Sequence, residues 1–312
     1  MKVVRIVGFA IGGVILLLAG VYAGGSYTAK RKLSKAYVVH TLDFPIPFPG
    51  ATEYVGQRES AAAVERGRHL VAARYGCAEC HGSNLGGGVM VDNAAIGRLL
   101  GPNLTAGSGS VTQGYRAADW DRIVRHGIKR SGTPALMPSQ DFQEMTDQEL
   151  SDIVSFIRSQ PPVDSEVPPP KLGPVGTMLI ATGKLPLSAD LIRSHDKPHA
   201  AAPPTAEPTA EFGRHLAATC MGCHRSDLGG GTIVGGDPSW PPAANLTSGS
   251  DGIGRWTFAD FTRAMREGKR PDGMAFRPPM ANVSGYTQKM TETELKALWS
   301  YLRSVPAVAD RE

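Results

Sequence analysis

Cys77-Ala78-Glu79-Cys80-His81 and Cys220-Met221-Gly222-Cys223-His224 are two copies of the pattern C-x-x-C-H, and this pattern decides the fold of the chain. C-x-x-C-H attaches a c-type haem through two thioether bonds, and the histidine beside the second cysteine reaches the iron. The chain has four cysteines and the two motifs contain all of them, so no thiol is left for a disulfide or a nucleophile. The motifs therefore predict two covalently bound haem c groups, with His81 and His224 as iron ligands.

The sequence around each motif is repeated as well. The cysteines, the histidine and one methionine recur at a constant spacing of 143 residues: Cys77, Cys80, His81 and Met137 as Cys220, Cys223, His224 and Met280. Flanking stretches recur with small changes in spacing: Gly67–Leu70 as Gly213–Leu216, Asn103–Thr105 as Asn245–Thr247, and Met145–Leu150 as Met290–Leu295. A duplicated domain explains this pattern. The alternative, four cysteines around one zinc ion, would leave the matched histidines and methionines unexplained.

The composition fits two small domains. A chain of 312 residues has room for two domains of ordinary size and additional segments. The net charge of +4 is modest and does not indicate the strongly basic face that nucleic-acid binding requires. The 37 glycines and 24 prolines, with 7% aromatic residues, favour loop-rich domains with small apolar cores. Such a domain buries little apolar surface by itself, so we expect the haem to complete each core and to be required for folding.

The N-terminal stretch is apolar and long enough to cross a membrane. No charged residue occurs between Arg5 and Lys30, and Ile6–Tyr27 is rich in valine, isoleucine, leucine, glycine and alanine. About 20 such residues span a bilayer as one helix, whereas the apolar part of a cleaved signal peptide has about 7–15. We therefore expect an uncleaved anchor, although Val21-Tyr22-Ala23 offers a site for cleavage.

The charges that flank this stretch and the haem motifs predict opposite orientations of the helix in the membrane. Lysines and arginines lie on both sides: Lys2 and Arg5 before it, and Lys30, Arg31, Lys32 and Lys35 after it. The positive-inside rule alone would keep the C-terminal side in the cytoplasm. Bacteria attach haem c outside the cytoplasmic membrane, so the motifs take precedence. We expect a single-pass protein of the bacterial cytoplasmic membrane whose haem domains face the periplasm.

Proline-rich segments separate the repeated parts. The expected units are a transmembrane anchor or signal segment at residues 1–30, a Pro-rich stalk at 31–60, a first haem domain at 61–160, a Pro-rich linker at 161–206 and a second haem domain at 207–308. The two haem domains are referred to below as the first and the second repeat. The linker contains an apolar patch, Val175–Leu187. We expect this patch to pack against a haem domain; contact with a partner or with the membrane is the alternative.

Each repeat is expected to form three or four helices joined by irregular loops. The last helix of the first repeat begins with a capping box, in which Thr146 caps the helix and Glu149 returns a hydrogen bond. Thr291 and Glu294 repeat this arrangement in the second repeat. Proline cannot continue a helix, so the two last helices are predicted to end before Pro161 and Pro306.

The first helix of each repeat carries a glycine that permits a close helix crossing. Gly67 and Gly213 occupy this position, and the absence of a side chain lets the last helix approach. The expected aromatic partners at the crossing are Phe156 and Tyr301.

The order of these features resembles the class I cytochrome c fold, twice, over nearly all of residues 61–308. That order is a helix with glycine, C-x-x-C-H, a further helix, a loop with methionine, and a last helix with an aromatic residue. The resemblance implies an all-α fold of two tandem domains. The second repeat is also similar to haem domains in the cytochrome c subunits of membrane-bound bacterial dehydrogenases, through Asn245-Leu246-Thr247, Gly252–Thr257, Asp260-Phe261 and Pro279-Met280. Those subunits usually carry three haems, whereas this chain has two motifs.

A sixth ligand for each iron is expected from the loop before the last helix. Met137 in Leu136-Met137-Pro138 and Met280 in Pro279-Met280-Ala281 occupy equivalent positions. The adjacent proline stiffens the loop because its ring fixes φ. A neutral thioether favours ferrous iron and raises the reduction potential relative to ligation by two histidines.

The remaining histidines are expected to have no part in ligation. His69 and His215 recur on the first helices and are interpreted as helix-surface residues. His126 has no counterpart in the second repeat, and the three others lie in the stalk or the linker: His40, His195 and His199. The resemblance implies that the Pro102 carbonyl holds the other ring nitrogen of His81; the residue aligned with Pro102 in the second repeat is Ala244.

These features favour an electron carrier over an enzyme. A methionine in both ligand loops closes the sixth position that a dihaem peroxidase needs open. We expect a membrane-tethered dihaem c-type cytochrome that transfers single electrons between respiratory partners, with no catalytic residue. Its partners would be a quinol-oxidising complex or dehydrogenase on one side and a terminal oxidase or soluble cytochrome on the other. The alternatives are a cytochrome c subunit of a membrane-bound dehydrogenase or oxidase complex and, less favoured, a dihaem peroxidase.

Overall fold

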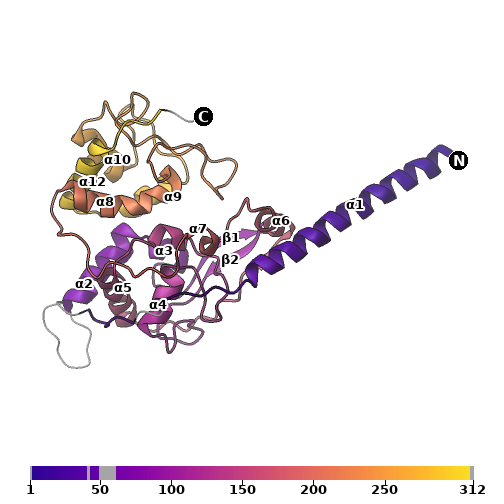
Figure 1. Cartoon of the computed structure of the whole chain (residues 1–312), viewed down its shortest axis with the longest axis horizontal. Helices are drawn as coiled ribbons and strands as arrows, with labels where there is room; N and C mark the ends of the chain where they lie inside the picture. Colours follow the sequence, from indigo (N-terminus) through magenta and orange to yellow (C-terminus); the bar gives the residue numbers. More distant parts are fainter. Residues whose placement is uncertain (1, 41–42, 49–60, 310–312) are drawn as a thin grey trace.

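The computed structural model describes residues 2–40, 43–48 and 61–309. It consists of two mainly helical bodies, one for each repeat, and a long N-terminal helix that projects away from the first repeat (Figure 1). The first repeat contains α2 (Ala61–His69), the π-helix η1 (Leu70–Arg74), α3 (Cys77–His81), β1 (Gly88–Asn93), β2 (Gly97–Gly101), α4 (Ala117–Val124), the 3₁₀-helix η2 (Ser139–Phe142) and α5 (Asp147–Ser159).

The linker and the second repeat complete the chain. The linker contributes β3 (Lys171–Leu172), α6 (Pro174–Thr182) and α7 (Ser188–Leu191). The second repeat contains α8 (Ala210–Ala217), the 3₁₀-helix η3 (Ala218–Cys220), α9 (Met221–His224), α10 (Phe258–Glu267), α11 (Met280–Thr287) and α12 (Glu292–Ser304). The expected tandem helical fold is confirmed.

The first and last helices cross at the predicted glycine in both repeats. A Cβ atom placed on Gly67 would lie 1.9 Å from the carbonyl oxygen of Asp152, and one placed on Gly213 would lie 1.9 Å from that of Ala297. Any larger residue would therefore force α2 from α5, or α8 from α12. The predicted aromatic partners are confirmed, because Phe156 and Tyr301 are the next contacts at the two glycines.

Both last helices begin with the predicted capping box. The Thr146 hydroxyl accepts a hydrogen bond from the Glu149 amide at 3.2 Å, and the Glu149 carboxylate accepts one from the Thr146 amide at 2.9 Å. The same two bonds join Thr291 and Glu294, at 3.1 and 2.7 Å. α5 ends at Ser159 and α12 at Ser304, shortly before the two prolines.

The last helices also supply the centre of each apolar core. Leu150 and Val154 are fully buried in the first repeat, and Leu295 is fully buried in the second. A cysteine of each motif packs at the margin of its core, Cys77 in the first and Cys220 in the second. A haem attached at these cysteines would therefore extend the apolar core rather than lie apart from it.

A small antiparallel sheet, which the sequence did not predict, belongs to the first repeat. β1 and β2 form a hairpin, and β3 from the linker pairs with the free edge of β2. Among the described residues, the second repeat has at the corresponding place only an isolated bridge between Gly231 and Ala243. The linker is thus joined to the first repeat by backbone hydrogen bonds.

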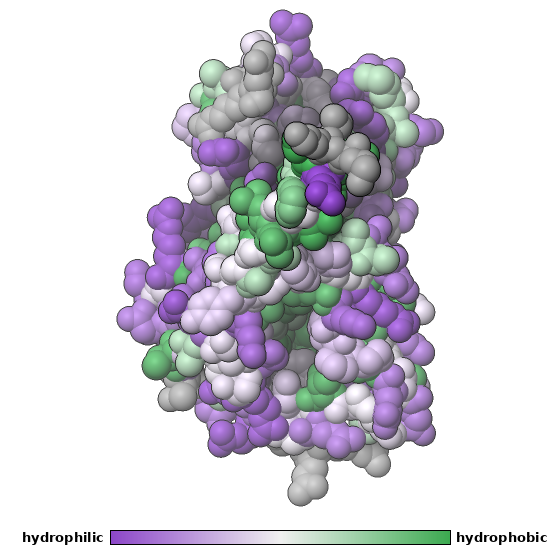
Figure 2. Space-filling view, turned by 90° about the vertical axis from the view of Figure 1, so that its right-hand side faces the viewer, coloured by the Kyte–Doolittle hydropathy of each residue, from purple (hydrophilic) through white to green (hydrophobic). Residues whose placement is uncertain are grey.

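The projecting helix α1 (Lys2–Leu33) meets the length and composition needed to cross a membrane. The most apolar 18-residue window within its segment Val4–Leu33 has a mean hydropathy of 2.4, and this window is not buried by the rest of the protein. Figure 2 looks along this helix from its free end and shows apolar side chains gathered around it. No acidic residue occurs in α1.

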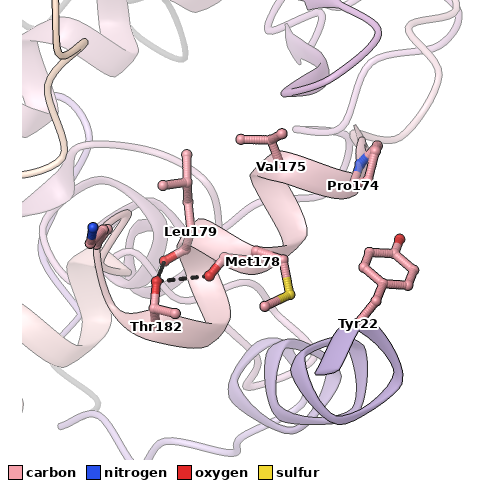
Figure 3. A pocket seen from close by; sticks show the side chains of 7 residues that line it. Tyr22, Pro174, Val175, Met178, Leu179 and Thr182 are labelled. Atoms are coloured by element: carbon pink, nitrogen blue, oxygen red, sulfur yellow. Dashed lines mark hydrogen bonds between the residues drawn. The ribbon is translucent and has the colours of Figure 1, made fainter. Parts of the chain in front are cut away.

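The C-terminal end of α1 packs against α6. Ala29 is only 2% exposed, and the Lys32 ammonium donates a hydrogen bond to the Ile180 carbonyl at 3.1 Å. Tyr22 of α1 lies across a shallow pocket from Met178 and Pro174 of α6 (Figure 3). The linker patch packs against the first repeat, as predicted, through a small cluster that includes Leu136. Its additional contact with α1 was not predicted.

The Pro-rich segment after α1 lies along the first repeat. Residues 34–40 and 43–48 form no helix or strand beyond a turn at the end of α1, as expected from their prolines. Phe44 is 8% exposed and belongs to the core of the first repeat, and the Ser151 hydroxyl donates a hydrogen bond to the Pro45 carbonyl at 3.0 Å. The rest of the expected stalk, residues 41–42 and 49–60, lies outside the described residues.

Candidate functional site

Each C-x-x-C-H motif forms a single turn of helix whose histidine is held by a backbone carbonyl. The Nδ1 atom of His81 donates a hydrogen bond to the Pro102 carbonyl at 2.9 Å. The Nδ1 atom of His224 donates one to the Ala244 carbonyl at 2.7 Å. Both expected acceptors are confirmed, although one is a proline and the other is not. A metal-binding histidine ordinarily has its second nitrogen fixed in this way, which leaves Nε2 free for the metal.

The cysteines lie in surroundings that favour neutral sulfur. Burial raises the pKa of the Cys77 thiol to about 12 and that of the Cys220 thiol to about 11. Zinc sites require thiolates, which this burial opposes, whereas the thioether bonds of haem c carry no charge. Within the described parts of the chain, no cysteine belongs to a group of three or more potential metal ligands. The donor set therefore fits haem c and does not fit a cysteine–zinc site.

The two candidate distal methionines lie in equivalent segments of the repeats, but Met137 lies in a loop as expected, whereas Met280 is the first residue of a helix. Each segment follows a short antiparallel bridge, Ile128–Pro134 in the first repeat and Lys269–Ala275 in the second. Met280 begins α11 and packs against the core that also contacts Cys220. Met137 is half-buried, and its carbonyl accepts hydrogen bonds from the Ser139 amide at 2.8 Å and from the hydroxyl of Ser188 in the linker.

The second attachment motif and the residue directly before the first one both lie at the contact between the repeats. A Cβ atom on Gly222, inside the second motif, would lie 2.0 Å from the carboxylate of Asp141 in η2 of the first repeat. A Cβ atom on Gly76, directly before the first motif, would lie 2.9 Å from the ring of Tyr286 in α11. Each motif therefore touches the segment that follows the candidate methionine of the other repeat.

Asp141 is a carboxyl group with few polar neighbours at this contact. Burial raises its pKa to about 6, although a hydrogen bond with Gln140 acts in the opposite direction. Within the described residues, its Oδ1 atom has no hydrogen-bond partner. Asp141 therefore changes charge close to neutral pH, beside the second attachment motif.

Two reciprocal histidine–glutamate pairs join the repeats. The Nε2 atom of His69 on α2 lies 2.9 Å from the Glu294 carboxylate, and the Nε2 atom of His215 on α8 lies 2.9 Å from the Glu149 carboxylate. Both glutamates are the capping-box residues of the last helices. The interpretation of the two histidines as helix-surface residues was incomplete, because the surface they occupy is the contact between the repeats. Their recurrence in both repeats was the signal.

Glu149 forms an ion pair with Arg74, and among the described residues Glu294 forms no ion pair with an arginine or a lysine. The Arg74 guanidinium donates to Glu149 at 2.6 Å, and the two side chains are only 7% and 3% exposed. Burial alone would raise the pKa of Glu149, but Arg74 and His215 lower it to about 2. Burial also acts to raise the pKa of Glu294, and the hydrogen bond with His69 lowers it below its ordinary value.

Comparison with known proteins finds the same repeat. The family model Cytochrome c matches residues 64–161 and 210–306. The chain is 27% identical over 271 residues to the fructose dehydrogenase cytochrome subunit of Gluconobacter japonicus, which covers 80% of this chain and 54% of that protein. It is 27% identical over 274 residues to the cytochrome c subunit of the alcohol dehydrogenase (quinone) of Gluconacetobacter polyoxogenes, covering 80% and 57%.

A shorter relative matches over most of its own length. The chain is 24% identical over 253 residues to a diheme cytochrome c-type protein of Cereibacter sphaeroides, which covers 75% of this chain and 83% of that protein. By contrast, the chain spans little more than half the length of the two dehydrogenase subunits.

Proposed function

Because this chain belongs to the cytochrome c family and carries one haem c in each repeat, we propose that it is a membrane-tethered protein that passes single electrons between respiratory partners through both haems. The family assignment establishes a dihaem electron-transfer protein. The tether, the partners and the route through the protein are the proposal. The observation that carries it is the contact of each attachment motif with the opposite repeat, at Gly222–Asp141 and Gly76–Tyr286.

The proposed axial ligands are His81 and Met137 in the first repeat and His224 and Met280 in the second. When bound, each haem supplies a one-electron ferric–ferrous couple. The carbonyls of Pro102 and Ala244 fix the histidine rings, so that Nε2 of each points away from the backbone partner. Methionine sulfur is neutral and favours the ferrous state. With both axial positions filled by protein, no substrate bond is made or broken.

The packing of α1 supports an anchor that stays in the mature protein. Ala29 and Lys32, in the last turns of α1, contact the linker helix α6, whereas a signal peptide is removed before the mature protein folds. We propose that residues 1–30 anchor the chain in the bacterial cytoplasmic membrane and that residues 61–160 and 207–308 form the haem domains in the periplasm.

The relatives support a choice of donor. Two of them are cytochrome subunits of a fructose dehydrogenase and an alcohol dehydrogenase (quinone). We propose that a dehydrogenase or a quinol-oxidising complex reduces this protein and that a terminal oxidase or a soluble cytochrome reoxidises it. Stable membership in a dehydrogenase complex is the alternative, and subunits that copurify from solubilised membranes distinguish the two.

Spectra of single ligand variants test the axial assignment. The purified protein should retain both haems through acid–acetone extraction and show six-coordinate, low-spin iron with the weak far-red band of methionine ligation. Met137→Leu and Met280→Leu should each remove about half of that band, and the double variant all of it. Met145→Leu, at a helix cap, is the matched control and should leave the band unchanged. High-spin ferric iron with peroxide turnover in the unmodified protein would instead indicate a peroxidase.

A further inference from the structure

Four side chains from three separate segments meet beside α4. Asp121 lies on α4 and His126 follows that helix, while His40 comes from the Pro-rich segment after α1 and His199 from the linker. One ligand atom of each lies within 4.8 Å of those of the other three. Asp121 and His126 are 1% and 0% exposed, and His199 and His40 are 8% and 12% exposed. No role was expected for these histidines from the sequence, because only folding brings them together.

The spacing of the ligand atoms matches the edges of a metal tetrahedron. The His199 Nε2 atom lies 3.1 Å from His126 Nε2 and 3.5 Å from Asp121 Oδ1. His126 Nε2 lies 3.7 Å from the same oxygen, and His40 Nε2 lies 3.5 Å from Asp121 Oδ2. Four ligands at about 2.0–2.1 Å around tetrahedral zinc are separated from one another by about 3.3 Å. The ligand atoms of His126, His199 and Asp121 lie close to this spacing, and that of His40 lies within 4.8 Å of the other three.

Hydrogen bonds behind the cluster direct the nitrogen lone pairs inward. His195 donates from Nε2 to the Ala189 carbonyl at 3.0 Å, so its Nδ1 accepts from Nδ1 of His126, also at 3.0 Å. His40 donates from Nδ1 to the His195 carbonyl at 3.0 Å. His126 and His40 are thereby left with unprotonated Nε2 atoms that face Asp121. This is the arrangement by which outer partners orient metal-binding histidines.

One ring nitrogen of the cluster faces the Asp121 carboxylate without a hydrogen bond. Within the described residues, His40 Nε2 has no hydrogen-bond partner. Arg125, a permanent cation, donates to Asp121 at 2.7 Å and also pairs with Asp147 at 2.8 Å. Two carboxylates thus share one guanidinium beside the unprotonated Nε2 atoms of His40 and His126.

We propose that His40, Asp121, His126 and His199 form a binding site for a divalent first-row metal ion, with zinc as the best match. Three imidazoles and one carboxylate are ligands that zinc accepts, and four protein ligands leave no open position, as in structural rather than catalytic zinc sites. His195 is a positioning residue, since it acts on the metal only through His126 and His40. The ion would fasten the segment after the membrane helix and the linker to the first repeat.

Zinc binding to the full-length, haem-loaded protein tests this site. The detergent-solubilised protein is stripped with a chelator and titrated with Zn²⁺ in competition with a chromophoric chelator. One zinc per chain is expected, and His199→Gln should weaken its affinity by about a hundredfold or more, because it removes a ligand. His195→Gln should weaken it by about 10–100-fold, the range for loss of an outer partner. His69→Gln, a histidine outside the cluster, is the matched control and should bind zinc normally.

X-ray absorption at the zinc edge tests the same site without any substitution. The expected nearest shell is four nitrogen and oxygen atoms at about 2.0–2.1 Å with imidazole scattering. A six-coordinate shell without imidazole scattering would overturn the proposal. So would zinc affinities that are equal in the unmodified protein and in a His199→Gln variant that retains both haems. The haem spectra report separately on the electron-transfer function, so failure of one proposal leaves the other standing.

Discussion

The two repeats have cores of the same design, but they differ in the segments that pack around those cores. Both have a helix crossing at glycine, a capping box and a histidine held by a carbonyl. The first repeat is also covered by the segment after α1 and by the linker, which adds β3 to its sheet. The comparison shows that both repeats keep the features around the haem attachment site, whereas the segment after α1 and the strand β3 are added to the first repeat.

A local difference of three residues adds to this asymmetry. His69 lies eight residues before Cys77, whereas His215 lies five residues before Cys220. In the first repeat the additional length forms the π-helix η1, in which the Tyr75 amide bonds to the Leu70 carbonyl. A π-helix is a common way to accommodate an insertion near a functional site. It positions Arg74 against Glu149, an interaction that Glu294 lacks among the described residues.

Loss of the Glu149 charge should reveal the largest difference in stability between equivalent substitutions in the two repeats. Glu149→Gln leaves Arg74 buried without its carboxylate, and breaking a buried ion pair in this way costs about 3–5 kcal/mol. Glu294→Gln removes a capping-box carboxylate and a bond to the more exposed His69, and about 1 kcal/mol is expected. Denaturant unfolding followed by circular dichroism measures both. Equal losses in the two variants would contradict the asymmetry.

Because Arg74 pairs with Glu149, the protein should lose stability in acid. The pKa of Glu149 is about 2 in the folded protein against an ordinary 4.5, so its ionisation stabilises the fold fully above pH 4.5. That contribution, on the order of 3 kcal/mol, disappears as the pH falls from 4.5 towards 2. The free energy of unfolding should therefore decline over this interval, with a shallower decline in Glu149→Gln. Parallel pH profiles for the two proteins would rule out this role.

Substitution of the crossing glycines should affect the two repeats equally. Gly67→Ala and Gly213→Ala each place a methyl group 1.9 Å from a backbone oxygen of the last helix. Overpacking of this kind typically costs about 1–3 kcal/mol. Unfolding of the two variants measures the loss, and Gly285→Ala, where a Cβ meets nothing within 4 Å, is the control. A large effect in only one repeat would show that the cores are less alike than the crossings indicate.

Asp141 should make the second haem sensitive to pH. Its pKa is raised to about 6 by burial beside the second motif. The ionised carboxylate favours ferric iron, so the potential of that haem should fall by tens of millivolts as the pH rises through 6. Redox titration with Asp141→Asn should show a flatter dependence.

The same substitution should increase stability at neutral pH. A raised pKa stabilises the folded state below pH 3.8, and that contribution is lost as the pH rises through 6. Asp141→Asn should therefore gain about 1–2 kcal/mol at pH 7. An unchanged pH dependence of both the potential and the unfolding free energy would show that Asp141 does not titrate in this range.

The smallest expected effect concerns the linker and the first ligand loop. Ser188→Ala removes the hydroxyl that bonds the Met137 carbonyl and Gln140, at a cost of about 1 kcal/mol. Thermal loss of the far-red band should then begin earlier for the first haem and be unchanged for the second. Ser284→Ala, which removes a hydroxyl bond to Ala281 within α11, is the matched control in the second repeat.

Much of the fold followed from local sequence patterns. The capping boxes, the glycine crossings and the carbonyls that hold His81 and His224 lie where they were predicted, because each depends on short-range spacing or on the repeat itself. The hairpin β1–β2 was missed, since Gly88–Asn93 and Gly97–Gly101 lack a strong alternating pattern. The apolar patch in the linker was expected to pack against a haem domain. Its contact with α1 could not be predicted, because it depends on the path that the linker takes back past the end of α1.

The sequence by itself determined the cofactors and the number of domains, because C-x-x-C-H is a covalent requirement whose two cysteines and histidine lie within five residues. Only the tertiary structure decided how the two repeats meet and which histidines gather. His69 and Glu294 are 225 positions apart, and His126 and His199 are 73 apart. No local period encodes such distances. They are set by the packing of helices and by the paths of proline-rich segments over the first repeat.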